Sequence, residues 1–132
     1  MDEDPLTVLV VDDDESVRRA MKRLLMSNGY QVLTFESAED FLLSGLVWDR
    51  ACLLLDIRLP GISGLDLQAR LAASGRMCPV IFMTAHDDSQ WLEMANEAGA
   101  VAFLRKPFGE RSLLNALAFT RGKGEGTDTS SD

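Results

Sequence analysis

The chain has a single histidine and only two cysteines among its 132 residues. Cys52 and Cys78 lie in apolar stretches without CxxC spacing or a histidine cluster, which argues against a zinc site or a redox pair. We interpret both as small buried hydrophobic residues of a protein in a reducing compartment. His86 is expected to be a solvated loop residue rather than a general base or a metal ligand.

Long apolar runs and clusters of basic residues are also missing. No apolar run approaches the ~20 residues that span a bilayer, and the N-terminal residues 1–4 are acidic where a signal peptide is basic. The 13 lysines and arginines are scattered and the formal net charge is −8, so this domain is not expected to bind nucleic acid or membranes. We therefore expect a cytoplasmic protein.

What the chain does contain is enough apolar sequence, 46% of its residues, to bury the core of one domain. The apolar run 8–11 ends abruptly at Asp12, Asp13 and Asp14, and the run 51–55 ends at Asp56 in the same way. Uninterrupted apolar runs of this length are typical of strands buried on both faces of a parallel sheet. Adjacent carboxylates repel one another unless water or a cation lies among them.

Strand patterns alternate with helix patterns along the chain. Apolar residues spaced three or four apart predict helices, and the pairs Asn28-Gly29 and Ser74-Gly75 indicate where two of them end. Ser37 and Ser63 each precede a helix as caps. The strands are expected at 8–11, 31–35, 51–56, 79–84 and 101–105, and the helices at 17–25, 38–45, 63–75, 88–98 and 110–119.

This alternation predicts an α/β fold, a doubly wound five-stranded parallel sheet with five helices on its two faces. The domain is expected to span 1–121. Residues 122–132 lack apolar side chains and are expected to form a disordered tail or linker. In such sheets ligands bind outside the carboxyl ends of the strands, so the residues at that edge are the candidates for function.

The strand-end residues form a chemically consistent set: Asp12, Asp13, Asp56, Thr84 and Lys106. Carboxylates are hard oxygen ligands that suit Mg²⁺, which readily shares its coordination sphere with phosphate oxygens. A carboxylate can also attack phosphorus and form an aspartyl phosphate. A lysine and a hydroxyl could then hold the remaining oxygens of the transferred group.

Four motifs in this order resemble the receiver domain of two-component response regulators, over Thr7 to about Arg121. They are Asp12-Asp13, Asp56-x-x-x-Pro60-x-x-x-Gly64, Thr84-Ala85 and Lys106-Pro107-Phe108. The resemblance implies the flavodoxin-like strand order 2-1-3-4-5. It also implies a phospho-accepting signalling domain rather than an enzyme, although one that assists its own phosphorylation and dephosphorylation.

The resemblance assigns a role to each residue of the acidic set. It makes Asp56 the phosphoacceptor. It makes Asp12, Asp13 and Asp56, together with the backbone carbonyl of Arg58, the ligands of Mg²⁺, with Mn²⁺ or Ca²⁺ as substitutes.

The same resemblance assigns roles to residues outside the acidic set. Thr84 and Lys106 would ligate the phosphoryl group, and the Lys106–Pro107 peptide bond would be cis. Phe103 would be the aromatic residue that swings inward together with Thr84. Arg58 and His86 would border the path of the attacking water and tune the lifetime of the phosphoryl group.

The implied partners are a sensor histidine kinase and an output domain or downstream protein, often a transcriptional one. The output surface would comprise the fourth helix, around Trp91, the fifth strand and the last helix. Phosphorylation would change the shape of this surface and could drive homodimer formation.

Three alternative interpretations compete with these roles. Asp14 is better explained as a helix cap than as a ligand, because it directly precedes a helix pattern. A flavodoxin-like cofactor binder needs a Ser/Thr/Gly-rich phosphate cradle, which the acidic run 12–15 cannot form. A haloacid-dehalogenase-like Mg²⁺-dependent phosphatase, with an Asp nucleophile, is the alternative function, but Arg58 stands at its second acidic position.

Overall fold

The computed structural model describes residues 6–45, 50–75, 78–84, 93–94, 96–97, 100 and 102–124, with side chains described as far as residue 120. Its centre is a five-stranded parallel sheet in the order β2-β1-β3-β4-β5. This arrangement confirms the predicted doubly wound sheet and its strand order. The strands are β1 (Thr7–Val11), β2 (Gln31–Phe35), β3 (Ala51–Asp56), β4 (Val80–Thr84) and β5 (Ala102–Arg105).

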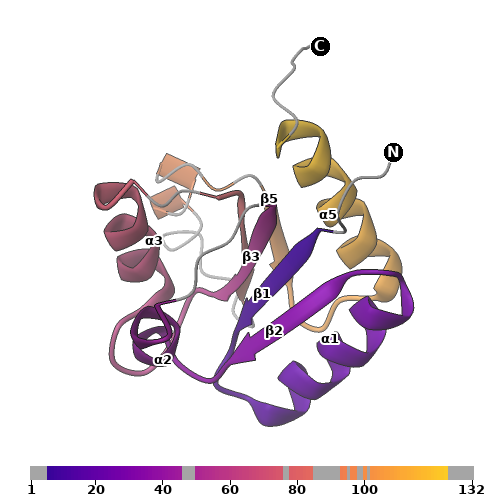
Figure 1. Ribbon diagram of the computed structural model, residues 1–132, viewed down its shortest axis with the longest axis horizontal. Helices are drawn as coiled ribbons and strands as arrows, with labels where there is room; N and C mark the ends of the chain where they lie inside the picture. The colour runs from indigo at the N-terminus through magenta and orange to yellow at the C-terminus, as the bar shows by residue number, and fades with distance from the viewer. Residues whose placement is uncertain are drawn as a thin grey trace.

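Helices cover both faces of the sheet, with α1 and α5 on one side and α2 and α3 on the other (Figure 1). Their bounds are α1 (Glu15–Ser27), α2 (Ala38–Leu43), α3 (Gly64–Ala73) and α5 (Glu110–Gly124). The predicted caps are confirmed, because the side chains of Asp14, Ser37 and Ser63 accept hydrogen bonds from the first turns of α1, α2 and α3.

The central strands supply side chains to two separate apolar layers. Val8 and Val10 of β1 pack toward α1 and α5, whereas Leu9 and Val11 pack toward α2 and α3. All four are fully buried, which explains why the run has no polar member. Full burial stabilises the fold by roughly 1.5–3 kcal/mol for each such side chain. The strand β3 is buried along its whole length in the same way, so the residues at the carboxyl ends of β1 and β3 follow from fully packed strands.

The structure describes four helices, one fewer than the five predicted. Most of the expected helix 88–98 lies outside the described residues, and its described pairs 93–94 and 96–97 are helical. The last helix also continues to Gly124, past the expected domain boundary at 121. Buried Thr120, whose hydroxyl donates to the Leu117 carbonyl, anchors this end, and helical hydrogen bonds propagate beyond it. Residues 125–132 of the expected tail lie outside the described residues.

The two cysteines are thiols that pack on opposite sides of the sheet, Cys52 toward α1 and α5 and Cys78 toward α2 and α3. Burial raises the pKa of the Cys52 thiol to about 12, so it behaves as the inert apolar residue that the sequence predicts.

None of the helices in the described ranges combines the length and the apolar character that crossing a bilayer requires.

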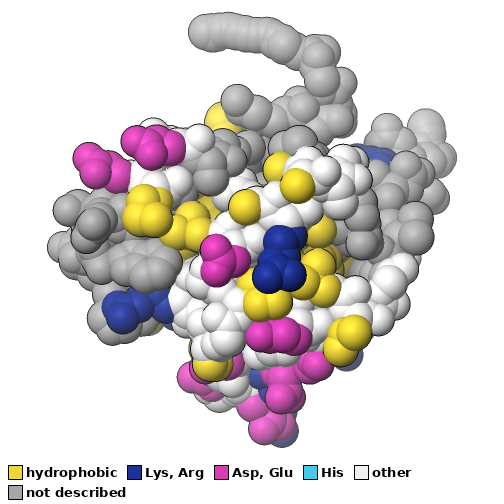
Figure 2. All heavy atoms as spheres, turned by 90° about the vertical axis from the view of Figure 1, so that its left-hand side faces the viewer, with side chains coloured by type: hydrophobic (Ala, Val, Ile, Leu, Met, Phe, Trp, Pro, Cys, Tyr) yellow, Lys and Arg dark blue, Asp and Glu magenta, His cyan; other side chains and the backbone are white. Residues whose placement is uncertain are grey.

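Acidic side chains gather at the lower end of the molecule in Figure 2, the end toward which the strands run in Figure 1.

Candidate functional site

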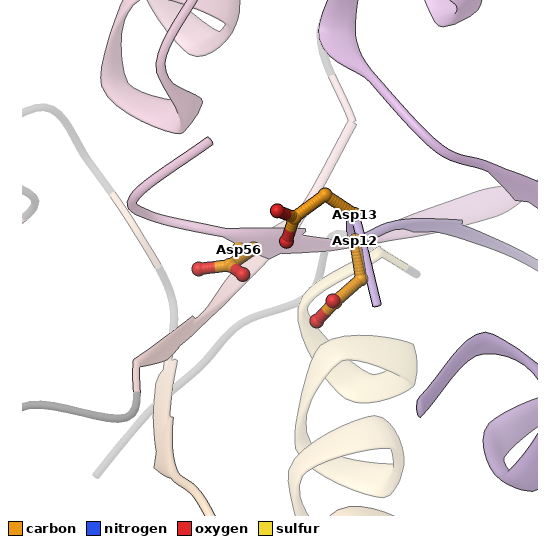
Figure 3. A group of neighbouring side chains, drawn as sticks. All are labelled: Asp12, Asp13 and Asp56. Carbon is orange, nitrogen blue, oxygen red and sulfur yellow. The ribbon is translucent and has the colours of Figure 1, made fainter. Parts of the chain in front are cut away.

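The acidic cluster lies where the two central strands end. β1 pairs with β3 so that Val11 lies opposite Leu55, and the chain continues from there into Asp12 and Asp56. The carboxylates of Asp12, Asp13 and Asp56 can place one oxygen each within 4.8 Å of one another. Figure 3 shows them grouped at this edge. The sheet register therefore brings together the three acids that the sequence placed at two separate strand ends.

Lys106 directly follows the edge strand β5, and its side chain extends to the same cluster. Its backbone N–H donates to the Thr84 carbonyl at 2.7 Å, which prolongs the pairing of β4 with β5, and the Lys106–Pro107 bond is cis. The Lys106 Nζ lies 2.6 Å from the Asp12 Oδ2 and 3.2 Å from the Asp56 Oδ2. One ammonium therefore bridges carboxylates from two different strands.

Both strand-end aspartates are also fixed by their own loops. The Asp14 N–H donates to the Asp12 Oδ1 at 2.9 Å, and the Arg58 N–H donates to the Asp56 Oδ1 at 3.1 Å. Each is a turn in which a carboxylate binds the backbone two residues on. Arg18 adds a contact that sequence reasoning missed, because its guanidinium donates to the Asp12 carbonyl at 2.8 Å. Its position on the polar side of an amphipathic helix gave no sign of this contact.

Burial and charge shift the pKa values in the cluster. Burial raises the pKa of Asp56, and the negative charge of Asp12 adds to the increase, against the opposing effects of Lys106 and the Arg58 N–H. Burial alone would lower the pKa of Lys106, but its hydrogen bonds and charge interactions with Asp12 and Asp56 outweigh this and raise it. Lys106 therefore keeps its positive charge at neutral pH, whereas the ionised form of Asp56 is less favourable here than in water.

The donor set fits a divalent cation. The three carboxylates converge, and among the described residues the Lys106 ammonium, which pairs with Asp12 and Asp56, offsets one of their three charges. Hard oxygen donors with surplus negative charge suit Mg²⁺, which needs few protein ligands and keeps several waters. Asp12 is fully buried and Asp56 nearly so, while Asp13 is exposed, so the cluster opens to solvent on one side.

The other predicted residues, Thr84, Phe103 and His86, differ in where they lie relative to the cluster. Thr84 is buried at the end of β4, one position beyond the Asp56 neighbour Met83. Phe103 belongs to the edge strand β5, where it pairs with Phe82, and it is 37% exposed. His86 lies outside the described residues. The structure therefore gathers the acids and Lys106, places Thr84 at the same edge, and leaves Phe103 partly exposed.

A flavodoxin-like sheet with an acidic cluster and a lysine at its carboxyl edge is the arrangement expected of a phospho-accepting receiver domain. The family model described as the response regulator receiver domain matches residues 8–118. The chain belongs to this family, and it is thus a receiver domain of two-component signalling. No finding supports the phosphatase alternative.

Relatives and solved structures agree with this assignment. Nodulation protein W of Bradyrhizobium diazoefficiens is 46% identical over 110 residues, which cover 83% of this chain and 48% of that protein. The transcriptional regulatory protein FixJ of Azorhizobium caulinodans is 42% identical over 118 residues, covering 89% and 56%. The crystal structure of FixJ-N is similar with a TM-score of 0.84 at 32% identity, over 97% of this chain and all of that one. The chain spans about half the length of the curated relatives it matches.

Proposed function

We propose that Asp56 accepts a phosphoryl group from the phosphohistidine of a sensor histidine kinase. The observation that carries this proposal is the unequal access to the two buried acids: the Asp56 side chain is 10% exposed, whereas the Asp12 side chain is sealed at 0%. A carboxylate oxygen of Asp56 attacks phosphorus while the phosphorus–nitrogen bond of the donor breaks, and the electron pair leaves with the imidazole.

The neighbouring side chains have supporting roles in this transfer. Asp12, Asp13 and Asp56, with the Arg58 carbonyl, would hold Mg²⁺, and Mn²⁺ or Ca²⁺ would substitute for it. When bound, the ion neutralises charge on the phosphoryl oxygens. Lys106 already contacts Asp56, and its ammonium would then donate a hydrogen bond to a phosphoryl oxygen. The same set would assist both phosphorylation and loss of the group.

The switch is proposed to run through Thr84 and Phe103. The phosphoryl group carries roughly −1.5 to −2 charge and replaces the single charge of the Asp56 carboxylate, so the site gains at most about one negative charge, now on three oxygens, which draws in Lys106 and the Thr84 hydroxyl. Phe103, exposed on β5, would then fill the space that Thr84 leaves. Phe103 and Phe119, both exposed, border the β5 and α5 part of the expected output face. The remaining part, around Trp91, lies outside the described residues.

The partners are inferred from the family and the relatives. A sensor kinase would supply the phosphoryl group, and an output domain or downstream protein, transcriptional as in the FixJ relative, would bind the changed face. Homodimer formation on phosphorylation and a cytoplasmic location remain predictions. Sedimentation mass with and without a beryllofluoride mimic tests the homodimer.

The main test is labelling by acetyl phosphate or by a kinase in the presence of Mg²⁺. Wild-type chain should take up one phosphoryl group, and Asp56→Asn should take up none. Undiminished labelling of Asp56→Asn would place the acceptor elsewhere. Many turnovers on small phosphomonoesters, without a stoichiometric label, would instead support the hydrolase.

The lifetime of the phosphoryl group is proposed to depend on Arg58 and His86, which would border the path of attacking water. Dephosphorylation rates of Arg58→Ala and His86→Ala should differ from the wild-type rate. Rates unchanged in both variants would discard this role.

A further inference from the structure

A carboxylate from outside the acidic cluster binds the loop between Asp56 and α3. Glu39, in the first turn of α2, accepts a hydrogen bond at its Oε2 from the Ile62 N–H at 3.0 Å, across 23 positions of the chain. Gly61 makes room for this contact: its φ is +75°, and a side chain there would collide with the Glu39 carboxylate. The bond therefore depends on a glycine at the position where the loop passes α2.

This loop, 57–63, is the segment that carries Arg58 beside the acceptor. Its two ends are fixed by backbone bonds, from the Ile57 N–H to the Met83 carbonyl at 3.0 Å and from the Gly64 N–H to the Ile57 carbonyl at 3.1 Å. Gly64 permits the close approach of α3, because a Cβ there would collide with the Asp56 carbonyl oxygen. Between these ends, Glu39 holds the loop to a different element of the fold.

The contact is electrostatically favourable. The Ile62 N–H, and to a lesser extent the backbone N–H of Glu39 itself, lowers the pKa of the Glu39 carboxyl, and the positive charge of Arg70 adds to this. An ionised acceptor makes a stronger hydrogen bond than a neutral one. Ile62 also packs against the core on the side of α2 and α3, so the bond and the apolar contact restrain the same residue.

On the basis of the proposed phospho-acceptor function, we propose that Glu39 is a positioning residue for that site. By binding the Ile62 N–H it holds the loop 57–63, and so keeps the Arg58 backbone where its N–H meets Asp56 and its carbonyl can reach the metal. Groups that orient a metal ligand typically change metal affinity by about 10- to 100-fold when removed. Glu39 acts one step further away, so an effect near the lower limit is expected.

Four single-site variants of the full chain test this role by calorimetric titration with Mg²⁺. Glu39→Ala removes the acceptor and should raise the Kd for Mg²⁺ by about tenfold. Glu39→Asp keeps the charge but is too short for Ile62, and it should weaken binding similarly. Glu39→Gln keeps an oxygen acceptor and should recover most of the affinity. Asp40→Ala is the matched control, because it removes an exposed carboxylate from the same helix turn, and it should leave the Kd unchanged.

The labelling rate gives a second measurement that a merely structural role would not alter in the same way. Glu39→Ala should be labelled more slowly than wild type at limiting Mg²⁺ and at the wild-type rate when Mg²⁺ is saturating. A lower melting temperature with an unchanged Kd for Mg²⁺ would overturn the inference, as would equal losses in Glu39→Ala and Asp40→Ala. Failure of wild type to be labelled at Asp56 would refute the proposed function instead, and the Mg²⁺ titration would still measure the effect of Glu39.

Discussion

Asp12 and Asp56 occupy equivalent places on neighbouring strands and yet differ in access. Each ends an apolar run, accepts a hydrogen bond from the N–H two residues on, and contacts Lys106 through its other oxygen. The Asp12 side chain is completely buried, and it is the closer of the two to the lysine, at 2.6 Å against 3.2 Å. The same local turn thus produces one sealed carboxylate and one that can react.

The two acids also differ in the connection between each of them and the next helix. After Asp12 the chain turns at once into α1, where Asp14 caps the helix and Arg18 binds back to the Asp12 carbonyl. After Asp56 a longer loop runs to α3 and is held from outside by Glu39. The acid with the short connection is the fully buried one, and the acid with the long connection is the partly exposed one. The strand-end motif is the same in both, so it does not by itself set the access.

Removing the shared lysine should have the largest effect on stability. Lys106→Met leaves Asp12 buried without its cation, and we expect a loss of about 3 kcal/mol in the free energy of unfolding at neutral pH without Mg²⁺, the lower end for a buried pair because Lys106 is partly exposed. Urea denaturation measures this. Arg19→Met, which breaks the exposed pair with Glu15, is the control and should change stability by less than about 1 kcal/mol. Equal effects of the two substitutions would mean that the bridge does not stabilise the fold.

Adding Mg²⁺ should have the next largest effect on the stability of the folded state. A cation that binds only the folded state stabilises it by mass action, by about 1.4 kcal/mol at a concentration ten times its Kd. Thermal melting in EDTA and in Mg²⁺ measures this gain. Asp13→Asn changes an exposed side chain, so it should reduce the gain while leaving the melting temperature in EDTA nearly unchanged. Coincident melting curves of wild type with and without Mg²⁺ would rule out the metal site.

Replacing each buried aspartate by asparagine should have a smaller effect on stability, and the effect should differ between Asp12 and Asp56. The raised pKa of Asp56 means that the folded state binds more protons than the unfolded chain between the ordinary carboxyl value, about 3.9, and the folded value. Wild-type stability therefore falls as pH rises through this window. Asp56→Asn removes that loss, so in EDTA its melting temperature should exceed that of wild type above the window and the excess should vanish below it.

The parallel substitution Asp12→Asn completes this test. Because Asp12 is the closer partner of Lys106, Asp12→Asn should melt below Asp56→Asn at neutral pH in EDTA. The opposite order would show that the lysine stabilises Asp56 more than Asp12.

Much of this site could be predicted because it depends on simple rules. Apolar runs that end in acids mark buried parallel strands, and the carboxyl ends of parallel strands share one edge, which brings Asp12, Asp56 and Lys106 together. The cap at Asp14 is a local signal, and the structure confirms it.

Other features depend on how helices settle on the sheet, and the sequence carries no local sign of them. Glu39 and Ile62 meet only because α2 packs beside the loop after β3, and Arg18 reaches the Asp12 carbonyl only from the first turns of α1. The unequal exposure of Asp12 and Asp56 is likewise a property of the packed fold. The extension of α5 to Gly124 could not be predicted because the glycine and charged residues there lack an apolar pattern.

Chemical mapping of the phosphoryl group on the wild-type chain tests the central claim most directly. After labelling with acetyl phosphate and Mg²⁺, borohydride reduces an aspartyl phosphate to homoserine, and peptide sequencing by mass spectrometry locates it. The proposed role of Asp56 predicts homoserine at position 56 and none at positions 12 and 13, and the complete burial of the Asp12 side chain argues separately against position 12. Homoserine at position 12 or 13, with position 56 unmodified, would contradict it.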